Sequence, residues 1–249
     1  MRTTGRLMLR LPLLLLSLVD QCMASLVLTV LRHAETEWNV QGRLQGSADS
    51  PLTPRGVCQA ELCAKRLQRK HYTAAYCSPL LRAKRTAELV VQGMDAPPTI
   101  VEDDRLRERA FGMWEGMVWE DIQRQYPDQV KLSQSDATFA QPGGGESRAD
   151  CLVRALDFLD DMTKSYPLPE DHVLVVTHSA TAVSLVKHVL GLPPAAKRSF
   201  NMYNLAINTM EYDAARGSWM LSTLGDCAHL GGVEYLGGAT EETDAWRWS

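Results

Sequence analysis

The sequence predicts an α/β fold of three layers, in which a mostly parallel sheet is covered by helices on both faces. Short apolar, β-branched runs alternate along the chain with longer segments of helical periodicity, and this alternation is typical of parallel sheets. The run over residues 25–31 is apolar nearly throughout, as expected for a central strand buried on both faces. With 249 residues, of which 45% are hydrophobic and 22% charged, the chain can form one substantial core.

The strands are expected to be short. After residues 25–31, strand patterns occupy residues 74–77, 99–102 and 173–177, and a hairpin is predicted from residues 206–212 and 219–224. The hairpin is expected to turn near Arg216 and Gly217. Ligands of such sheets bind beyond the carboxyl ends of the strands, so the residues directly after strands are the first candidates for a site.

Helices are predicted over residues 54 to about 70, 80–93, 117–126, 146–164 and 181–190. Thr53 and Pro54 supply a cap and a first-turn proline for the first of them. Pro127 is expected to end the third helix. Residues 128–145 show no clear period and close on Pro-Gly-Gly-Gly, so they are expected to form a loop.

Residues 1–24 precede the predicted domain, and three interpretations of them stay open. Arginines precede the apolar run 11–19, and residues 22–24 are small enough for a cleavage site, which together are typical of a secretory signal peptide. Met23 is instead a candidate start, because residues 23–31 lead straight into the first strand. A mitochondrial leader is the third interpretation. A membrane-spanning helix is not expected, because Asp20 interrupts the run before it reaches about 20 apolar residues.

The six cysteines form no CxxC pair and no zinc-like spacing. Most lie in apolar helical or strand patterns, where a buried free thiol is expected, and this favours a reducing compartment. We therefore expect a cytoplasmic protein with a catalytic domain over residues 25–235 and a polar tail over residues 236–249. Secretion or mitochondrial import through residues 1–24 is the alternative. The sequence carries no indication of oligomeric state.

The formal net charge of −4 gives the chain no general attraction to nucleic acid or to an anionic membrane. Neither kind of stable partner is expected. A local basic cleft can still concentrate potential against the net charge, so a small anionic substrate remains compatible with the composition.

An arginine–histidine pair directly follows the first predicted strand. Arg32 and His33 open the segment Arg-His-Ala-Glu-Thr-Glu-Trp-Asn, residues 32–39. A guanidinium binds and neutralises phosphate oxygens, while a neutral imidazole can attack phosphorus in line. For this segment alone, a surface Arg-His pair is the alternative.

Three further segments carry candidate residues for the same chemistry. Arg82 lies one turn into the helix after strand 74–77, where helix N–H groups favour an anion, although a solvated basic helix face would look the same. His178 ends the strand 173–177 and opens the next helix, where histidine is often structural. Glu108 lies among arginines and apolar residues as either a general acid or a salt-bridge partner.

In their order and spacing, these segments resemble the first branch of the histidine phosphatase superfamily, also called phosphoglycerate mutase-like. The motifs that carry the resemblance are RHAETEWN, RLQGSADSPLTPRG, SPLLRAKRTAE, LRERAFGMWEG, PGGGES and VVTHSA. They are specific in combination, and the resemblance extends from Ser25 to about Leu230. It implies the three-layer phosphoglycerate mutase-like fold and an enzyme that acts on phosphate monoesters.

The resemblance also implies a role for each candidate residue. His33 would become phosphohistidine, and Glu108 would protonate the leaving alkoxide and then accept a proton from water. The oxygens of the transferred phosphoryl group would be held by Arg32, Arg82 and a protonated His178. The polar substrate-binding positions would be Thr36, Asn39, Gln45 and Gly46. No metal or other cofactor is implied, because the cationic side chains supply the electrostatic stabilisation.

The chain departs from the family at Ala34, where glycine usually follows the histidine. A methyl group is tolerable there if the residue has a negative φ, but it could crowd a substrate oxygen. We expect activity to survive this departure.

Hydrolysis is expected rather than return of the phosphoryl group to a second hydroxyl. Mutases of the family resemble one another in a long segment with lysine and paired arginines between the acid and the second histidine. Here Glu108 and His178 are only 70 residues apart, and no two arginines are adjacent between them. Phe111 replaces the tyrosine usual in mutases, and the PGGGES loop is similar to phosphatases. A mutase remains the alternative. A non-catalytic phospho-ligand binder is disfavoured, because all the core catalytic positions are kept.

The motifs look like those of TIGAR-type fructose-2,6-bisphosphatases and equally like those of broad-specificity phosphatases. The expected substrate is a small phosphorylated metabolite, such as fructose 2,6-bisphosphate or a glycolytic phosphate. Arg43, Arg109 and Lys131 are candidate contacts to a second anionic group, with solvated surface charge as the alternative for each.

Overall fold

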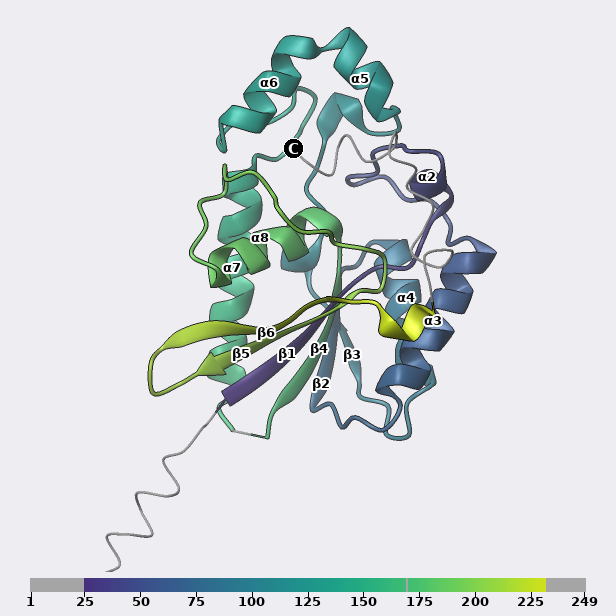
Figure 1. Cartoon of the computed structure of the whole chain (residues 1–249), viewed down its shortest axis with the longest axis vertical. Helices are drawn as coiled ribbons and strands as arrows, with labels where there is room; N and C mark the ends of the chain where they lie inside the picture. The colour runs from purple at the N-terminus through teal and green to yellow at the C-terminus, as the bar shows by residue number, and fades with distance from the viewer. Residues whose placement is uncertain (1–24, 169, 232–249) are drawn as a thin grey trace, which may run out of the picture.

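A six-stranded sheet forms the middle of the computed structural model (Figure 1), which describes residues 25–168 and 170–231. The strands are β1 (Ser25–Arg32), β2 (Ala74–Cys77), β3 (Ile100–Glu102), β4 (His172–Thr177), β5 (Ile207–Asp213) and β6 (Ser218–Asp226). Their order is β3-β2-β4-β1-β5-β6. The first four run parallel to one another, while β5 pairs antiparallel with β1 and β6 antiparallel with β5. The predicted mostly parallel sheet is confirmed, and the predicted hairpin forms its antiparallel edge.

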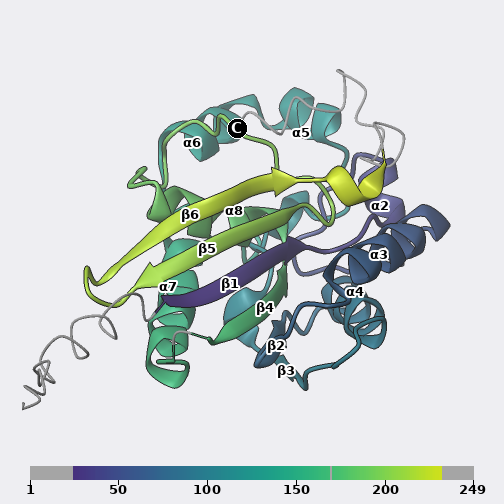
Figure 2. The ribbon, with the colours of Figure 1, turned by 60° about the horizontal axis from the view of Figure 1, so that its bottom comes forward.

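The helices are α2 (Glu37–Val40), α3 (Pro54–Leu67), α4 (Leu81–Gln92), α5 (Trp119–Gln125), α6 (Pro127–Ser135), α7 (Arg148–Ser165) and α8 (Ser179–Val189), with short 3-10 turns at Asp104–Leu106, Gly112–Trp114 and Ala228–Leu230. They cover both faces of the sheet, as predicted (Figure 2). The apolar residues of α3 and α4 pack with Leu174 and Val176 on one face. Those of α7 and α8 pack with Val173 and Val175 on the other. Successive residues of a strand point to opposite faces, so β4 contributes to both cores.

The segment after Pro127 differs from the prediction of a loop over residues 128–145. Residues Pro127–Ser135 form α6, and Pro127 occupies its first turn, where the missing N–H of proline is not needed. The proline therefore begins a helix directly after α5 ends. The helix buries only Val130, which explains why its sequence shows no apolar period. The short helix α2 was not predicted, and the predicted helices differ from the structure only at their ends: α3 ends at Leu67 and α5 begins at Trp119.

Residues 112–135, which we call the cover, lie beyond the carboxyl ends of the central strands and include α5 and α6 (Figure 1). The cover has an apolar cluster of its own, formed by Trp114, Trp119, Ile122 and Val130. None of these four residues belongs to the two cores on the sheet faces.

The predicted leader over residues 1–24 and the predicted tail over residues 236–249 lie outside the described residues. Within residues 25–168 and 170–231, no helix has both the length and the apolar composition needed to cross a bilayer. The cysteines of this part, Cys58, Cys63, Cys77, Cys151 and Cys227, are free thiols.

Candidate active site

Two histidines lie next to each other because they follow neighbouring parallel strands. Arg32 of β1 pairs with Thr177 of β4, so His33 and His178, the next residue in each case, leave the sheet side by side. Their ring centroids are 5.2 Å apart, and both side chains are buried. The structure thus brings together two residues that are 145 positions apart in the sequence.

The hydrogen bond of His33 determines its tautomer. Its Nδ1 lies 2.7 Å from the carbonyl oxygen of Ala34, which can only accept, so Nδ1 carries the proton and Nε2 keeps its lone pair. Burial, followed by the positive charges of Arg82 and Arg32, holds the pKa of His33 well below 6.5. The ring is therefore neutral at neutral pH, as a nucleophilic imidazole must be. Asn204 fixes the backbone of the same residue by donating to the His33 carbonyl oxygen over 2.7 Å.

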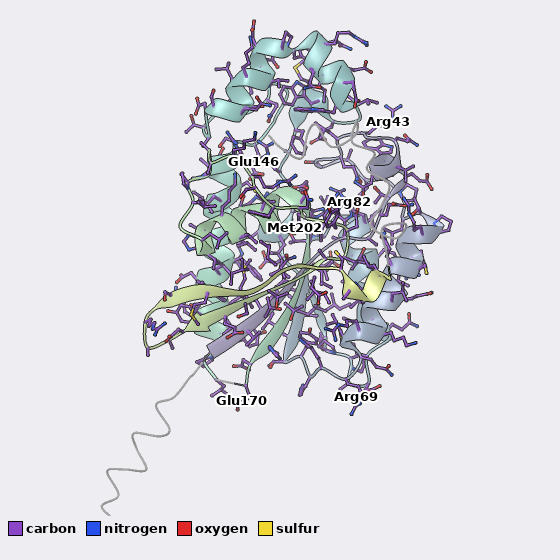
Figure 3. The ribbon with its side chains drawn as sticks, in the orientation of Figure 1. Arg43, Arg69, Arg82, Glu146, Glu170 and Met202 are labelled. Atoms are coloured by element: carbon purple, nitrogen blue, oxygen red, sulfur yellow. The ribbon has the colours of Figure 1, made fainter. Side chains whose placement is uncertain are left out.

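The guanidinium of Arg82 lies near the carboxyl ends of the strands, whereas Arg69 and Glu170 lie at the opposite end of the molecule (Figure 3). Arg82 Nη1 donates to the carbonyl oxygen of Ala48 and to Asp49 Oδ1, both over 2.8 Å. Arg82 Nη2 donates to the carbonyl oxygen of Gly46 over 2.7 Å. The side chain of Arg82 is fully buried. Three acceptors on residues 46–49 therefore hold this cation in one place before any ligand binds.

Asp49 also connects this loop to α4. Its Oδ2 accepts the N–H of Leu81 over 2.9 Å, at the start of a helix whose own N-cap residue makes no side-chain capping bond. One carboxylate thus caps the helix that carries Arg82 and neutralises part of the guanidinium charge.

Arg32 and His178 are held in comparable ways. Arg32 Nη1 donates to the carbonyl oxygen of Met202 over 2.7 Å. His178 Nε2 lies 2.8 Å from Ser78 Oγ, and Ser78 in turn accepts the N–H of Leu80. The Ser78 hydroxyl proton is thereby free to point at Nε2, which leaves the His178 Nδ1 protonated and without a hydrogen-bond partner among the described residues.

The sequence-based expectation of a protonated His178 is not supported by its surroundings. Burial lowers the pKa of His178 well below 6.5, and the positive charge of Arg82 lowers it further. A neutral His178 can still donate one N–H, from Nδ1, to an oxygen of a bound anion.

Glu108 lies at the beginning of α8. Its carboxylate accepts the N–H of Ala180 over 3.1 Å and the N–H of Arg109 over 2.9 Å. These bonds place the carboxyl group at the helix start that also carries His178, and the carboxyl lines the same pocket as His33.

Thr36 positions two of the other predicted residues instead of lining the pocket itself. Its hydroxyl oxygen accepts the N–H of Asn39 over 3.2 Å and the side-chain N–H of Gln45 over 2.9 Å. The Asn39 side chain accepts the N–H of Thr36 in return, which makes a capping box at the start of α2.

Glu35 anchors the loop that follows His33. Its carboxylate accepts from the hydroxyl of Thr53 over 2.7 Å and forms an ion pair with Arg55. A Cβ on Gly56 would lie 2.2 Å from the Glu35 carbonyl oxygen, so the first turn of α3 approaches the loop more closely than any other residue would allow. These contacts explain why the LTPRG segment accompanies the histidine motif.

The methyl group of Ala34 points into the protein and does not crowd the pocket. Ala34 is completely buried in the core beneath α3 and α4 and is not part of the pocket lining. Leu205 is the one non-glycine residue of the described chain with a positive φ, so Ala34 meets the backbone condition for its methyl group.

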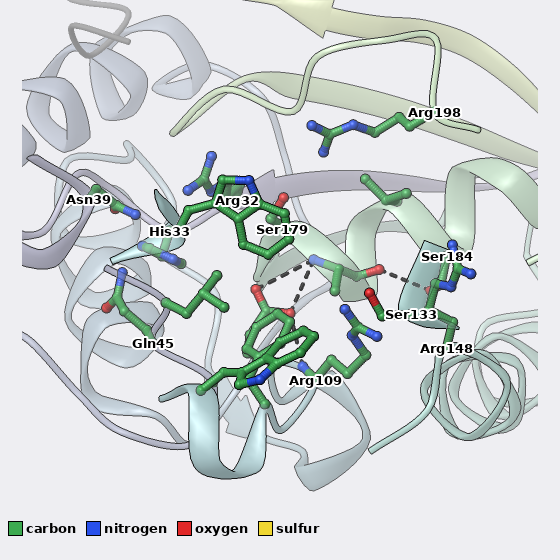
Figure 4. Close-up of a pocket in the computed structure, with 18 of the residues that line it drawn as sticks. Arg32, His33, Asn39, Gln45, Arg109, Ser133, Arg148, Ser179, Ser184 and Arg198 are labelled. Carbon is green, nitrogen blue, oxygen red and sulfur yellow. Dashed lines mark hydrogen bonds between the residues drawn. The ribbon is translucent and has the colours of Figure 1, made fainter. Parts of the chain in front are cut away.

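The candidate residues meet in one pocket of about 130 Å³, between the strand ends and the cover (Figure 4). Seven of the nine predicted site residues line it: Arg32, His33, Asn39, Gln45, Gly46, Arg82 and Glu108. The other two, Thr36 and His178, contact residues that do. The walls also include the aromatic rings of Trp38, Phe111, Trp114 and Trp119.

The pocket is strongly cationic. Its lining carries the positive side chains of Arg32, Arg43, Arg82, Arg109, Arg148, Lys187 and Arg198. Among the described residues of the lining, Glu108 is the one acidic side chain, so the local potential favours an anionic ligand despite the negative net charge. Of the three candidate second-anion contacts, Arg43 and Arg109 line the pocket, whereas Lys131 lies on α6 with 79% of its side chain exposed.

Residues 25–168 and 170–231 contain no group of three His, Cys, Asp or Glu side chains placed to hold a metal ion. Sequence reasoning gave no role to Asp49, Glu115 or Asn204, although all three fix the site. Glu115 accepts the N–H of Ser47 over 3.0 Å and that of Phe111 over 2.9 Å, and so joins the Arg82-binding loop to the cover. Asp49 and Glu115 lie within the motifs RLQGSADSPLTPRG and LRERAFGMWEG. No local pattern in the sequence indicates a role for Asn204.

Comparison with known proteins identifies one family. A sequence profile of the histidine phosphatase superfamily (branch 1) matches residues 28–226. Phosphoserine phosphatase 1 of Hydrogenobacter thermophilus is 31% identical over 204 residues, which cover 82% of this chain and 94% of that protein. Probable phosphoglycerate mutase GpmB of Serratia proteamaculans is 31% identical over 208 residues, or 81% of this chain and 93% of that protein.

Among solved structures, Bacillus stearothermophilus YhfR matches with a TM-score of 0.73 and 32% identity, covering 82% of this chain and 98% of that one. These matches confirm the resemblance inferred from the motifs and the phosphoglycerate mutase-like α/β fold. With a profile match over most of its length and relatives above 30% identity, this chain belongs to branch 1 of the histidine phosphatase superfamily and is a phosphatase of that superfamily.

Proposed function

We propose that this protein hydrolyses a small phosphate monoester through a phosphohistidine formed on Nε2 of His33. One observation carries the proposal: the bond from His33 Nδ1 to the Ala34 carbonyl oxygen leaves a lone pair on Nε2 of a buried, neutral ring beside two arginines. A neutral imidazole that faces a cationic anion site is suited to attack phosphorus.

In the first step, the Nε2 lone pair attacks phosphorus while the bond between phosphorus and the leaving oxygen breaks. Arg32, Arg82 and His178 hold the three remaining oxygens, whose charge spreads in the transition state. Because the guanidinium of Arg82 is already fixed by backbone acceptors and the ring of His178 by its hydrogen bond with Ser78, they need little reorganisation during the reaction. Glu108 supplies the proton that the leaving alkoxide takes up.

In the second step, water attacks the phosphohistidine. Glu108, now a carboxylate, accepts a proton from this water while the bond between phosphorus and Nε2 breaks. Inorganic phosphate leaves, and His33 and Glu108 return to their starting protonation states. The protein therefore needs no external oxidant, reductant or cofactor to complete the cycle.

The substrate that we propose is a small phosphorylated metabolite with a second anionic group. The cationic lining supports this class, which includes the fructose 2,6-bisphosphate and glycolytic phosphates suggested by the motifs. It also includes phosphoserine, which a relative of this chain is named for. Hydrolysis is favoured over the mutase alternative by the spacing of only 70 residues between Glu108 and His178 and by the phosphatase relative, although another relative is named a probable mutase.

The test of the intermediate is rapid quenching with a radiolabelled phosphodonor. Wild-type protein should carry an acid-labile, base-stable label, and His33→Ala should carry none. His71→Ala changes an exposed histidine outside the pocket and should keep the label. A wild-type protein that hydrolyses the donor without ever carrying the label would exclude the proposed mechanism.

The role of Glu108 is tested separately with aryl and alkyl phosphates. Glu108→Gln should slow the poor alkyl leaving groups far more than the good aryl ones, because only the former need a proton in the transition state. Equal losses for both would remove Glu108 from the acid role. A panel of phosphorylated metabolites, followed for phosphate release and for isomerisation, separates a hydrolase from a mutase. A pure binding protein would release no phosphate from any of them.

A further inference from the structure

The pocket extends along α8, away from the two histidines. Ala180, Ser184 and Lys187 all line it, and their spacing of four and three residues puts them on one face of the helix. Lys187 lies eight residues after Ser179, which corresponds to a rise of roughly 12 Å along the axis.

Positive charges gather at this far end. Figure 4 shows His33, Asn39 and Gln45 at one end of the pocket and Arg148 at the other. Burial lowers the pKa of Lys187 to about 8, and the charges of Arg148, Arg198 and Arg109 contribute to the same shift. The three arginines are thus close enough to repel the Lys187 ammonium.

Several donors of these cations have no acceptor. Arg109 Nε and Nη1 are buried without a hydrogen-bond partner among the described residues, as is Arg148 Nε. The Lys187 ammonium donates to the carbonyl oxygens of Pro194 and Ala196, at 3.1 and 2.5 Å, which uses two of its three protons. Buried donors of this kind are costly unless something accepts from them.

The carboxylates in the neighbourhood are already engaged. Glu146 forms an ion pair with Arg154 at 2.7 Å, and Asp136 accepts from both the N–H and the hydroxyl of Thr138. Glu108 accepts two backbone N–H groups at the catalytic end. The far end of the pocket therefore holds an excess of positive charge that these side chains do not balance.

We propose that the far end of the pocket is a second anion subsite, in which Arg109, Arg148 and Lys187 bind the terminal carboxylate or phosphate of a substrate whose other end lies at His33. This proposal rests on the proposed function, because the phosphoryl group at His33 fixes the first end of the ligand. The distance along α8 selects an extended chain of about six carbons.

The experiment compares substrates that differ only in the distal group. 6-Phosphogluconate and sorbitol 6-phosphate share a chain and a phosphate, but the first ends in a carboxylate and the second in a hydroxymethyl group. Hexane-1,6-diol bisphosphate and 6-hydroxyhexyl phosphate make the same comparison for a distal phosphate. The readout is the ratio of kcat/KM within each pair, so any general loss of activity in a variant cancels.

In the wild-type protein, at least one distal anion should raise kcat/KM by about tenfold or more, the amount expected for a charged hydrogen bond in a partly buried site. Arg148→Met and Lys187→Met should each reduce that ratio toward one. Lys131→Met is the matched control, since it removes an exposed cation of the cover that lies outside the pocket, and its ratio should equal that of the wild type. A high ratio in the first pair indicates a carboxylate subsite, and a high ratio in the second pair indicates a phosphate subsite.

Two failures are distinguishable. If the wild-type protein hydrolyses p-nitrophenyl phosphate but treats both members of each pair alike, the subsite does not exist and the proposed function stands. The same conclusion holds if the preference is present but survives both variants. If p-nitrophenyl phosphate is not hydrolysed at all, the proposed function itself fails.

Discussion

Asp49 provides the sharpest test of how the site is held together. Asp49→Ala removes a charged hydrogen bond to a completely buried guanidinium and the acceptor for the first free N–H of α4. The first loss is worth about 1.5–3 kcal/mol and the second about 1 kcal/mol. Asp49 is 24% exposed, and Arg82 keeps its two carbonyl acceptors. We therefore expect Asp49→Ala to lower the unfolding free energy by about 2.5 kcal/mol, the lower end of the combined range.

For a domain of this size, about 2.5 kcal/mol corresponds to a Tm lower by about 5–10 °C. The turnover number should fall by about 10–100-fold, because Arg82 loses the carboxylate that fixes its position and small misplacements of a catalytic contact are costly. Asp49→Asn keeps an acceptor oxygen in the same place and should lose less in both measurements. The assays are urea unfolding followed by tryptophan fluorescence, and kcat with an aryl phosphate.

Asp121→Ala is the matched control. It breaks an ion pair with Arg124 that is exposed on α5, so its cost should stay below about 1 kcal/mol, with kcat unchanged. If Asp49→Ala unfolds and turns over like Asp121→Ala, the carboxylate does not position Arg82 and the reasoning from buried hydrogen bonds is refuted.

Three further predictions follow from the geometry. Ala34→Gly should lower the unfolding free energy by roughly 1 kcal/mol and change kcat little, because the methyl group is packed in the core; a large gain in rate would contradict this. Gly46→Ala should lose both stability and activity, since the added Cβ would lie 2.1 Å from a carboxylate oxygen at a φ of +57°. Gly144→Ala, with a φ of +87° but nothing within 4 Å, should show only the cost of the backbone strain. NMR titration should place the midpoints of His33 and His178 well below pH 6.5, because burial disfavours their cations; the unfolded chain then binds more protons below pH 6.5, so the unfolding free energy should decrease as the pH falls through that range. Midpoints near 6.5 would contradict the burial argument.

The alternation of strands and helices was readable in the sequence because each buried strand is apolar on both faces. The positions of the site residues follow from the same pattern, since side chains directly after parallel strands meet at one edge of the sheet. The pattern thus predicts that His33, Arg82 and His178 lie at the same edge, while their shared role is predicted only by the family resemblance.

What the sequence does not reveal depends on contacts between distant segments. Asn204 reaches the His33 carbonyl oxygen only because β5 pairs with β1 and the chain before β5 crosses the strand end. The cations Arg148, Lys187 and Arg198 come from separate parts of the chain and share a pocket only in the fold. Helix α6 replaces the predicted loop, and the sequence does not indicate it because only Val130 of its residues is buried, so the apolar period typical of a packed helix is absent.

The separate apolar cluster of the cover has an evolutionary consequence. Ile122 and Val130 pack with Trp114 and Trp119, which line the pocket, so mutations in either residue act on this wall and not on the cores that support the strand ends. New substrate preferences can therefore arise by exchange of this one segment, while the apparatus for phosphoryl transfer is inherited intact.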